Sequence, residues 1–475
     1  MKPTSHAFSA NAHDALQDRD LQRALKLMET GFSAGRRTAV ARLPEFDELC
    51  EQGRAIKNHV LEHLDFYLER FEGEVVARGG FVHWCATPRE ACETILSLCR
   101  SVRAKTVTKG KSMVAEEIGL NPFLEANGIE PVETDLGEYI IQLADQSPSH
   151  IIAPAVHLTT DQISDLFLEH HREHGKTKRL TEPQEMVGEA REILRERYFQ
   201  ADVGITGANF LIAETGTTII VTNEGNGDLT QMLPRMHIVI SSIEKVLPTL
   251  EDAWTILRVL ARSATGQDIS CYTTFSTGPK RAEDLDGPAE FHIVLLDNGR
   301  SSMLGSELQD ALRCIRCGAC MNSCPVYQSV GGHAYGWVYP GPIGAAIDPF
   351  FIGLKEAHDL PAASSFCGAC ESVCPMKIPL PKIMRHWREK AFEEKITPVP
   401  QRAGMLIWAW FARRVTFYRL ATRVAAGLFG LLGRRRGRFS RLPFAAGWTA
   451  GRDLPAPEGS TFHDLWSARA RKPPA

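Results

Sequence analysis

Apolar residues recur at three- and four-residue intervals in the first part of the chain. They do so over residues 14–32 and again over residues 46–71. This spacing places the apolar side chains on one face of an α-helix, where they can pack against other elements. We therefore expect a helical N-terminal region over residues 1–72.

From Gly79 the pattern changes to short apolar runs separated by amphipathic stretches. Strands that alternate with helices predict an α/β domain with a mostly parallel sheet, and we place this domain at residues 73–300. Residues 208–225, ANFLIAETGTTIIVTNEG, predict a hairpin with Gly216 in its turn. The strand-like runs are 79–85, 104–110, 149–156, 208–214, 217–222, 236–242 and 291–297, and the clearest helical stretches are 88–100, 161–171 and 182–199.

After Gly299 this alternation ends and two cysteine-rich runs follow. Residues 305–313 predict a helix before the first run, and residues 379–395 predict a helix with proline at its start after the second. We expect a mainly helical domain at residues 301–396. From 397 to 475 the chain forms a basic C-terminal tail, in which arginines crowd together with almost no acids.

Composition narrows the class of protein. The chain has 475 residues, 44% of them hydrophobic, and a net charge of −3, which gives no support to nucleic-acid binding. The opening residues MKPTSHAFSANAHDALQDRD are polar and contain acids, unlike a secretion signal. We find no uninterrupted apolar segment long enough to span a bilayer. A cytoplasmic location is therefore expected.

Seven of the twelve cysteines form two short runs, CIRCGACMNSCP at 314–325 and CGACESVCP at 367–375. Cytosolic thiols stay reduced, which argues against disulfides, and such close spacing favours a shared metal centre. We interpret the other five as small buried hydrophobic side chains: Cys50, Cys85, Cys92, Cys99 and Cys271.

The first run has the spacing C-x2-C-x2-C-x3-C-P, in which three cysteines hold one iron–sulfur cluster and the fourth ligates another. Zinc held by paired C-x2-C knuckles is the main alternative, but four cysteines within eleven residues fit two such pairs poorly. The pattern predicts a two-cluster, ferredoxin-like domain. It assigns Cys314, Cys317, Cys320 and Cys374 to cluster 1, and Cys324, Cys367 and Cys370 to cluster 2.

The second run lacks one cysteine. Two four-iron clusters need eight ligands, and the missing eighth is expected at position 364, where the chain has Ser364. The expected cofactors are two [4Fe-4S] clusters, but cluster 2 has alternatives. It is a three-iron cluster with a vacant corner, or a four-iron cluster whose last iron takes the Ser364 oxygen, water or another chain's ligand. With either form of cluster 2, the two clusters together would accept and pass single electrons.

The α/β region offers weaker candidates, and no catalytic residue can be assigned in it. The turn KTVTKGKSM at 105–113 lacks the P-loop glycine, having Lys105 in its place. We favour a solvated basic turn over an anion site built from Lys109 or Lys111. Glu214 ends an apolar run beside a glycine turn, as the CoA-transferase nucleophile does, but a structural hydrogen bond is the favoured role.

The histidines show no ligand pattern. His150, His157 and His292 lie near apolar runs and are interpreted as core or surface residues, while HREH at 171–174 is expected to be solvated. The segment NEGNGD at 223–228 has no G-x-G-x-x-G, so a dinucleotide fingerprint is absent from it.

Longer segments resemble a known family, the lactate utilisation protein B family, which is the iron–sulfur subunit of a bacterial lactate utilisation system. Its cysteine region is matched by CIRCGACMNSCPVY, GGHAYGWVYPGPIGAAI and SSFCGACESVCPMKIPL. Its lactate-utilisation domain is matched by TKGKSMVAEEIGL, ITGANFLIAETGTTIIVTNEGNGDL and PAEFHIVLLDNGR, and its tail by GWTAGRDLPAP. The cysteine runs alone are shared with many two-cluster proteins, so the combination carries the resemblance.

The resemblance implies an electron carrier in the oxidation of L-lactate to pyruvate, acting with two other lactate utilisation proteins of the same system. It implies two four-iron clusters on the seven cysteines and leaves the eighth ligand open. For the upstream domain it implies the fold of CoA transferases and ribose-phosphate isomerase, which is an analogy of fold only. The electron acceptor is unknown, with the membrane quinone pool an indirect candidate, and no nucleic-acid partner is expected.

Two alternatives remain. In the tail, apolar stripes alternate with arginines over residues 405–439. This pattern suits an amphipathic helix on the inner face of a membrane, although docking against protein is favoured.

The alternative function is an enzyme whose α/β domain converts a carboxylate or thioester, with the clusters as electron acceptors. The lack of a flavin or nicotinamide motif favours the carrier.

Overall fold

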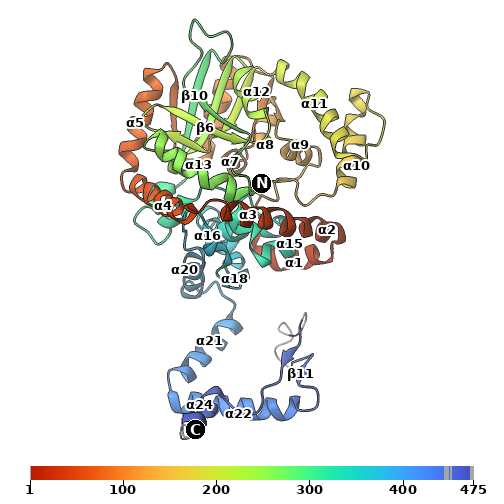
Figure 1. The fold of residues 1–475 in the computed structure, drawn as a ribbon, viewed down its shortest axis with the longest axis vertical. Coiled ribbons are helices and arrows are strands. Elements are labelled where there is room, and N and C mark those ends of the chain that lie inside the picture. The colour runs from red at the N-terminus through yellow and green to blue at the C-terminus, as the bar shows by residue number, and fades with distance from the viewer. Residues whose placement is uncertain (1, 443–448, 450–451, 471–475) are drawn as a thin grey trace. The chain divides into compact units, whose positions relative to one another are not determined.

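In a computed structural model of the chain, residues 2–442, 449 and 452–470 are described. The chain divides into two units, Met1–Ala391 and Phe392–Ala475. The first unit contains the two larger sheets and all twelve cysteines (Figure 1). The predicted domain boundaries within it stay predictions, because its parts pack into one body.

Helices fill the first 77 residues, as the apolar spacing predicted. The long helices α4 and α5 pack beside the α/β sheets, α4 against α13 and α5 against β1. The helices are α1 (Phe8–Gln17), α2 (Arg19–Met28), α3 (Ala34–Ala41), α4 (Phe46–Glu62) and α5 (Leu64–Ala77), with a π-helical turn at Glu29–Ser33 between α2 and α3.

These N-terminal helices reach the region around the cysteine runs. The Thr4 N–H donates to the Gly336 carbonyl at 2.8 Å, and the Phe8 ring packs edge-on against Tyr335 with 5.2 Å between ring centroids. The Ser33 hydroxyl donates to the Asn322 carbonyl at 2.7 Å. The start of the chain is thus joined to a segment about 300 residues further on.

The predicted parallel sheet is confirmed. Six strands run in the order β1-β10-β7-β4-β2-β3, and every neighbouring pair is parallel. Side chains alternate between its faces, so that Val294 of β10 lies in one core and Ile293 in the other. The strands are β1 (Phe81–Cys85), β2 (Thr106–Lys109), β3 (Glu130–Glu133), β4 (Val203–Gly207), β7 (Met236–Ser242) and β10 (Glu290–Leu296).

Helices cover both faces of this sheet. On one face α6, α7 and α8 bury Cys92, Ile95 and Leu120, while on the other α5 buries Phe71. Each such side chain contributes roughly 1.5–3 kcal/mol of burial free energy. The helices of this region are α6 (Pro88–Ser101), α7 (Met113–Ile118), α8 (Leu120–Glu125), α9 (Leu136–Leu143), α10 (Thr160–His170), α11 (Pro183–Gln200), α12 (Asn226–Met232) and α13 (Leu250–Ala264).

A second sheet of four strands contains the predicted hairpin. Its order is β8-β5-β6-β9, and β5 and β6 are antiparallel neighbours. Gly216 in the turn has a φ of +62°, and a Cβ there would lie 2.6 Å from the backbone nitrogen of Val75, so only glycine fits. The strands are β5 (Phe210–Ile212), β6 (Thr217–Thr222), β8 (Val246–Leu247) and β9 (Tyr272–Ser276).

Three sequence predictions are wrong in this region. Residues 149–156 form turns and no strand, because the His150 ring accepts hydrogen bonds from the backbone N–H groups of Ile152 and Ala153. Cys271 is exposed, whereas the other four scattered cysteines are buried as expected. His171 is buried and hydrogen-bonded to Tyr139, so that part of HREH is not solvated.

Short helices surround the cysteine runs. They are 3-10 turns at Arg300–Met303, Gln309–Arg313 and His333–Tyr335, and the helices α14 (Ala319–Asn322), α15 (Pro325–Val330), α16 (Gly341–Phe351), α17 (Leu354–Ala357), α18 (Asp359–Ala363), α19 (Ala369–Ser372) and α20 (Leu380–Glu393). The helix predicted at 305–313 is therefore only a 3-10 turn near its end.

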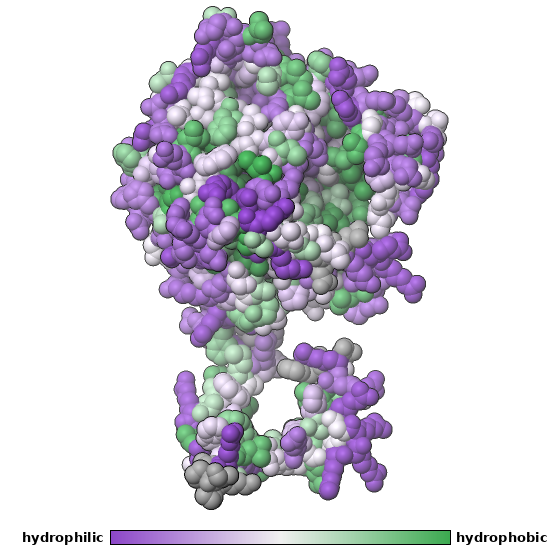
Figure 2. Space-filling view, viewed as in Figure 1, coloured by the Kyte–Doolittle hydropathy of each residue, from purple (hydrophilic) through white to green (hydrophobic). Residues whose placement is uncertain are grey.

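The second unit contains two long helices, α21 (Val399–Ala412) and α22 (Val415–Gly433), then β11 (Arg438–Phe439), β12 (Leu454–Pro455) and α24 (Phe462–Ala470). Apolar and hydrophilic patches lie side by side on its surface (Figure 2). By length and composition alone α22 is long and apolar enough to cross a membrane, although Arg419 and Arg423 interrupt its apolar sequence. The tail motif GWTAGRDLPAP lies partly outside the described residues.

Candidate iron–sulfur centre

The two cysteine runs follow the same backbone path. Arg316 and Phe366, one residue before CGAC in each run, have φ values of +58° and +53°. The glycines within CGAC, Gly318 and Gly368, have φ values of +72° and +80° and lead into the short helices α14 and α19. The runs are therefore structural repeats, in which Cys314 of the first corresponds to Ser364 of the second.

The thiols interact in two groups that match the predicted ligand sets. Burial raises the pKa of Cys320, and the charges of Cys314, Cys317 and Cys374 raise it further, with a smaller effect from Cys370. Burial likewise raises the pKa of Cys370, and the charges of Cys324 and Cys367 add to it. Each group draws thiols from both runs. This arrangement supports the assignment to clusters 1 and 2, which stays a prediction.

Burial makes these thiols poor candidates for free thiolates. It raises the pKa of Cys370 to about 12 and that of Cys374 to about 11, and neighbouring thiols add to the effect. A positively charged partner is needed to hold them deprotonated at neutral pH. Iron supplies that charge when a cluster is bound, so the donor set fits an iron–sulfur cluster.

The cysteine sulfurs do not form a group as tight as a bound zinc ion requires. Among the described residues, the groups of metal-ligand side chains with all donor atoms within 4.8 Å of one another include no cysteine. Tetrahedral zinc–thiolate bonds of about 2.3 Å would need sulfur–sulfur distances of about 3.8 Å.

Ser364 occupies the position of a ligand in the second run. The Phe366 N–H donates to the Ser364 Oγ at 3.2 Å, as the Arg316 N–H donates to the Cys314 Sγ at 3.4 Å. Ser364 also lines a small, mainly apolar cavity together with Cys324, Cys367 and Cys370. Its hydroxyl thus stands with the three thiols of cluster 2 where a fourth cysteine would stand.

Arg388 of α20 holds the loop that carries Ser364. Its guanidinium donates to the carbonyl of Ser364 at 2.7 Å and to that of Pro361 at 2.8 Å. The same group lies 4.0 Å from the centre of the Phe366 ring, a cation–π contact. The loop is therefore fixed on both sides of Ser364.

A buried charge network joins the α/β region to the first run. Arg300 makes two hydrogen bonds to the Glu117 carboxylate, at 2.9 and 2.6 Å, and Tyr339 donates to it at 2.5 Å. Burial opposes ionisation of Glu117, but Arg300 lowers its pKa below the usual value. Glu244 lies 3.2 Å from Arg300 and 3.9 Å from Arg316, and these cations bring its pKa to about 2 against the effect of burial.

The basic turn after β2 differs from the prediction. Lys109 is fully buried, with its ammonium 2.7 Å from Glu133 and 3.1 Å from Glu116, so it is neither solvated nor available to an anion. Glu116, Glu133 and Glu138 have the spacing of a metal site, but the Lys109 ammonium already occupies it as the ion-pair partner of the first two. Lys111 is half-buried and pairs with Asp135 at 3.4 Å.

The remaining candidates have structural roles. Glu214 accepts a hydrogen bond from the Leu250 N–H at 2.7 Å, the favoured interpretation. His150, His157 and His292 are buried. His150 hydrogen-bonds Asn322, between two cysteines of the first run, and His157 hydrogen-bonds Ser149.

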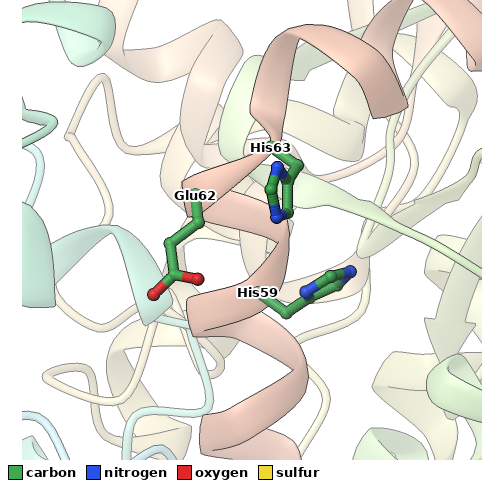
Figure 3. Close-up of side chains that lie close together, drawn as sticks. All are labelled: His59, Glu62 and His63. Carbon is green, nitrogen blue, oxygen red and sulfur yellow. The ribbon is translucent and has the colours of Figure 1, made fainter.

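A separate group at the end of α4, His59, Glu62 and His63, has donor atoms within 4.8 Å of one another (Figure 3). All three side chains are exposed, and His59 is already hydrogen-bonded to Tyr67 at 2.9 Å. We assign no metal to them.

Three family profiles match the chain in sequence order. A LUD domain matches residues 68–296, a 4Fe-4S dicluster domain matches residues 310–378, and the lactate utilisation protein B C-terminal family matches residues 393–471. The dicluster match covers all seven cysteines of the two runs and Ser364.

Full-length relatives are similar throughout. The chain is 43% identical to lactate utilization protein B of Geobacillus kaustophilus, over 98% of this chain and 94% of the relative. It is 40% identical to the protein of that name in Bacillus subtilis, over 99% and 98%. A solved DUF162 family structure from Deinococcus radiodurans aligns with 49% of this chain and 98% of its own at 14% identity, with a TM-score of 0.26, and carries no argument.

Proposed function

This chain belongs to the lactate utilisation protein B family, has a 4Fe-4S dicluster domain and acts in lactate utilisation, and from that premise we propose that it is the electron carrier in the oxidation of L-lactate to pyruvate. The repeated cysteine runs carry this proposal. Cys320 of the first thiol group is near enough to Cys370 of the second for the Cys370 charge to raise the Cys320 pKa, so two clusters would lie within electron-transfer reach. The first cluster would be held by Cys314, Cys317, Cys320 and Cys374.

The protein's own residues would set how the clusters behave. The Ile378 N–H donates to the Cys374 Sγ at 3.4 Å, and such hydrogen bonds to sulfur tune the reduction potential. Arg316 lies beside Cys314 and adds positive charge to the first site. When bound, the clusters take up and release single electrons, while the chain holds them apart from most of the solvent.

For cluster 2 we propose a four-iron cluster with Cys324, Cys367, Cys370 and the Ser364 oxygen as ligands. Support comes from the equivalence of Ser364 with Cys314 and from the cavity that Ser364 shares with the three thiols.

The test is anaerobic purification followed by iron and sulfide counting and electron paramagnetic resonance. The full chain should show two reducible four-iron signals. Ser364→Ala should lower the count from about eight iron atoms per chain to about seven and give a three-iron signal, whereas Ser364→Cys should keep both four-iron signals. Ser372→Ala, at an exposed serine of the second run that does not line this cavity, is the matched control. Two four-iron signals in Ser364→Ala would show that another group ligates the last iron.

We propose that two other lactate utilisation proteins supply and accept the electrons and that the isolated chain is no lactate oxidase. Purified, cluster-loaded protein should be reduced by dithionite yet fail to oxidise L-lactate with an artificial acceptor. Turnover by the chain alone would instead support the enzyme alternative. We also propose that the protein is cytoplasmic or lies at the inner surface of the membrane, in the latter case through α21 and α22. For the α/β domain we propose a CoA-transferase-like fold.

A further inference from the structure

The sheet topology leaves a crevice between β2 and β4. After β2 the next strand of this sheet is β3 on one side, whereas after β4 the chain passes through β5 and β6 of the second sheet and returns as β7 on the other side. In open parallel sheets, connections that diverge in this way leave a ligand site outside the carboxyl ends of the two strands. Gly110 and Lys111 follow β2 here, and Ala208 and Asn209 follow β4.

A cavity of about 450 Å³ lies at this point, within the usual size range for small-molecule and cofactor sites. Part of its wall is apolar, including Ile140, Ile151 and Ile220. Another part is polar, including Thr206 and Asn209. Arg316, between the first two cysteines of the first run, also lines it. The cavity therefore borders the backbone loop of cluster 1.

More positive than negative side chains line the cavity. Lys111, Lys245 and Arg316 face Asp135 and Glu224. Asp135 is already engaged, since it pairs with Lys111 and accepts the N–H groups of Gly137 and Glu138 at the start of α9.

Lys245 is the cation with least compensation. Within the described part of the chain its ammonium has no ion pair within 4 Å and donates to the Ala208 carbonyl at 2.5 Å. An ammonium has three donors, so at least one other N–H is left for a ligand. Burial lowers the Lys245 pKa to about 8, although Glu244 opposes this, and an anion in the cavity would restore the charged form.

We propose that this cavity binds a small organic anion, whose carboxylate or phosphate group lies at Lys245 and whose apolar part lies along the isoleucine wall. The proposal deepens the proposed function, because it places the anion beside the loop of cluster 1. A substrate carboxylate and a phosphate-bearing redox cofactor share this chemistry.

The test is calorimetric titration of the cluster-loaded full chain with three probes: L-lactate, pyruvate and flavin mononucleotide. We expect saturable binding of at least one. Binding of lactate or pyruvate would identify a substrate site, and binding of the flavin would identify a cofactor site. Binding of none of them overturns the proposal.

Two variants with opposite expected effects on the binding affinity test where the anion lies. Lys245→Met should weaken binding roughly tenfold or more, as expected for loss of a charged hydrogen bond, whereas Glu224→Gln, which removes a negative charge from the wall, should strengthen it. Lys280→Met, at an exposed lysine of the same domain, is the matched control. Equal affinities in all three variants would also overturn the proposal. Because iron content and resonance signals are read separately, failure of this site is distinguishable from failure of the electron-carrier proposal.

Discussion

The buried Glu117 carboxylate, which Arg300 and the Tyr339 hydroxyl both bind, should hold the α/β region and the cysteine region together. The Glu117 and Arg300 side chains are essentially inaccessible, at 0% and 1% exposure. Replacing Glu117 with Gln removes the charge that faces two guanidinium nitrogens, the Tyr339 hydroxyl and the Asn298 amide, at 2.5–2.9 Å. Arg300 would retain only Glu244 as a charged partner.

Breaking a buried pair from one side costs about 3–5 kcal/mol, because the other charge stays buried without full compensation. With a urea m-value of about 3 kcal/mol/M, the unfolding midpoint of Glu117→Gln should fall by about 1 to 1.7 M. The assay is urea unfolding of the anaerobic, cluster-loaded chain, followed by circular dichroism and by cluster absorbance. The two signals should shift together.

An exposed pair provides the control. Glu93→Gln breaks the ion pair with Arg89 at 2.7 Å on the surface of α6, and its midpoint should not change measurably. In the double variant Glu117→Met with Arg300→Met the recovery should be only partial, because the pair is removed but the buried Glu244 loses its 3.2 Å contact with Arg300. A midpoint for Glu117→Gln equal to that of the control would refute the reasoning.

Two further predictions concern the tail and acid stability. A chain ending at Thr397 should keep its full iron content, since all seven cysteines lie in the first unit, and loss of iron on purification would make the tail part of the cluster domain. Burial lowers the pKa of His237 to about 3, so below about pH 6.5 the unfolded chain binds a proton that the folded chain does not, and stability falls as the pH drops towards 3. Between pH 7 and 5.5, His237→Asn should therefore show a smaller loss of urea midpoint than the parent, and an equal loss would show that His237 is not the group responsible.

Local patterns predicted the elements whose partners are near in sequence. The hairpin at Gly216 and the helices around residues 46–77 follow from spacing and turn chemistry, and both are confirmed. The prediction of a strand at 149–156 failed because the His150 ring bonds the following backbone N–H groups and holds the segment in turns. Ser149 and His150 bond to Tyr327 and Asn322, far away in the chain, and no local pattern reports such partners.

The candidate site shows the same division. The spacing of the cysteines was sufficient to propose two ligand sets and to single out Ser364. The cavity was missed because its wall comes from many separate segments between residues 110 and 316. The charge that matters most there, Lys245, lies in an unremarkable stretch of sequence. An unpaired lysine after a buried strand is the signal that could have drawn attention to it.

The bonds between the first helices and the region around residue 336 have a consequence for synthesis. At roughly 5–20 residues per second, the ribosome takes about 15 to 65 s to make the 330 residues that separate Ser5 from its acceptor, the Tyr335 carbonyl. During that interval Phe8 has no Tyr335 to pack against, and the apolar faces of α1 and α2 have only each other and their near neighbours in sequence. The N-terminus is therefore made first and docks last, which exposes it to proteases and chaperones for most of translation. Slower synthesis would lengthen that exposure, and in a chain that stops before residue 336 the N-terminal helices would stay exposed.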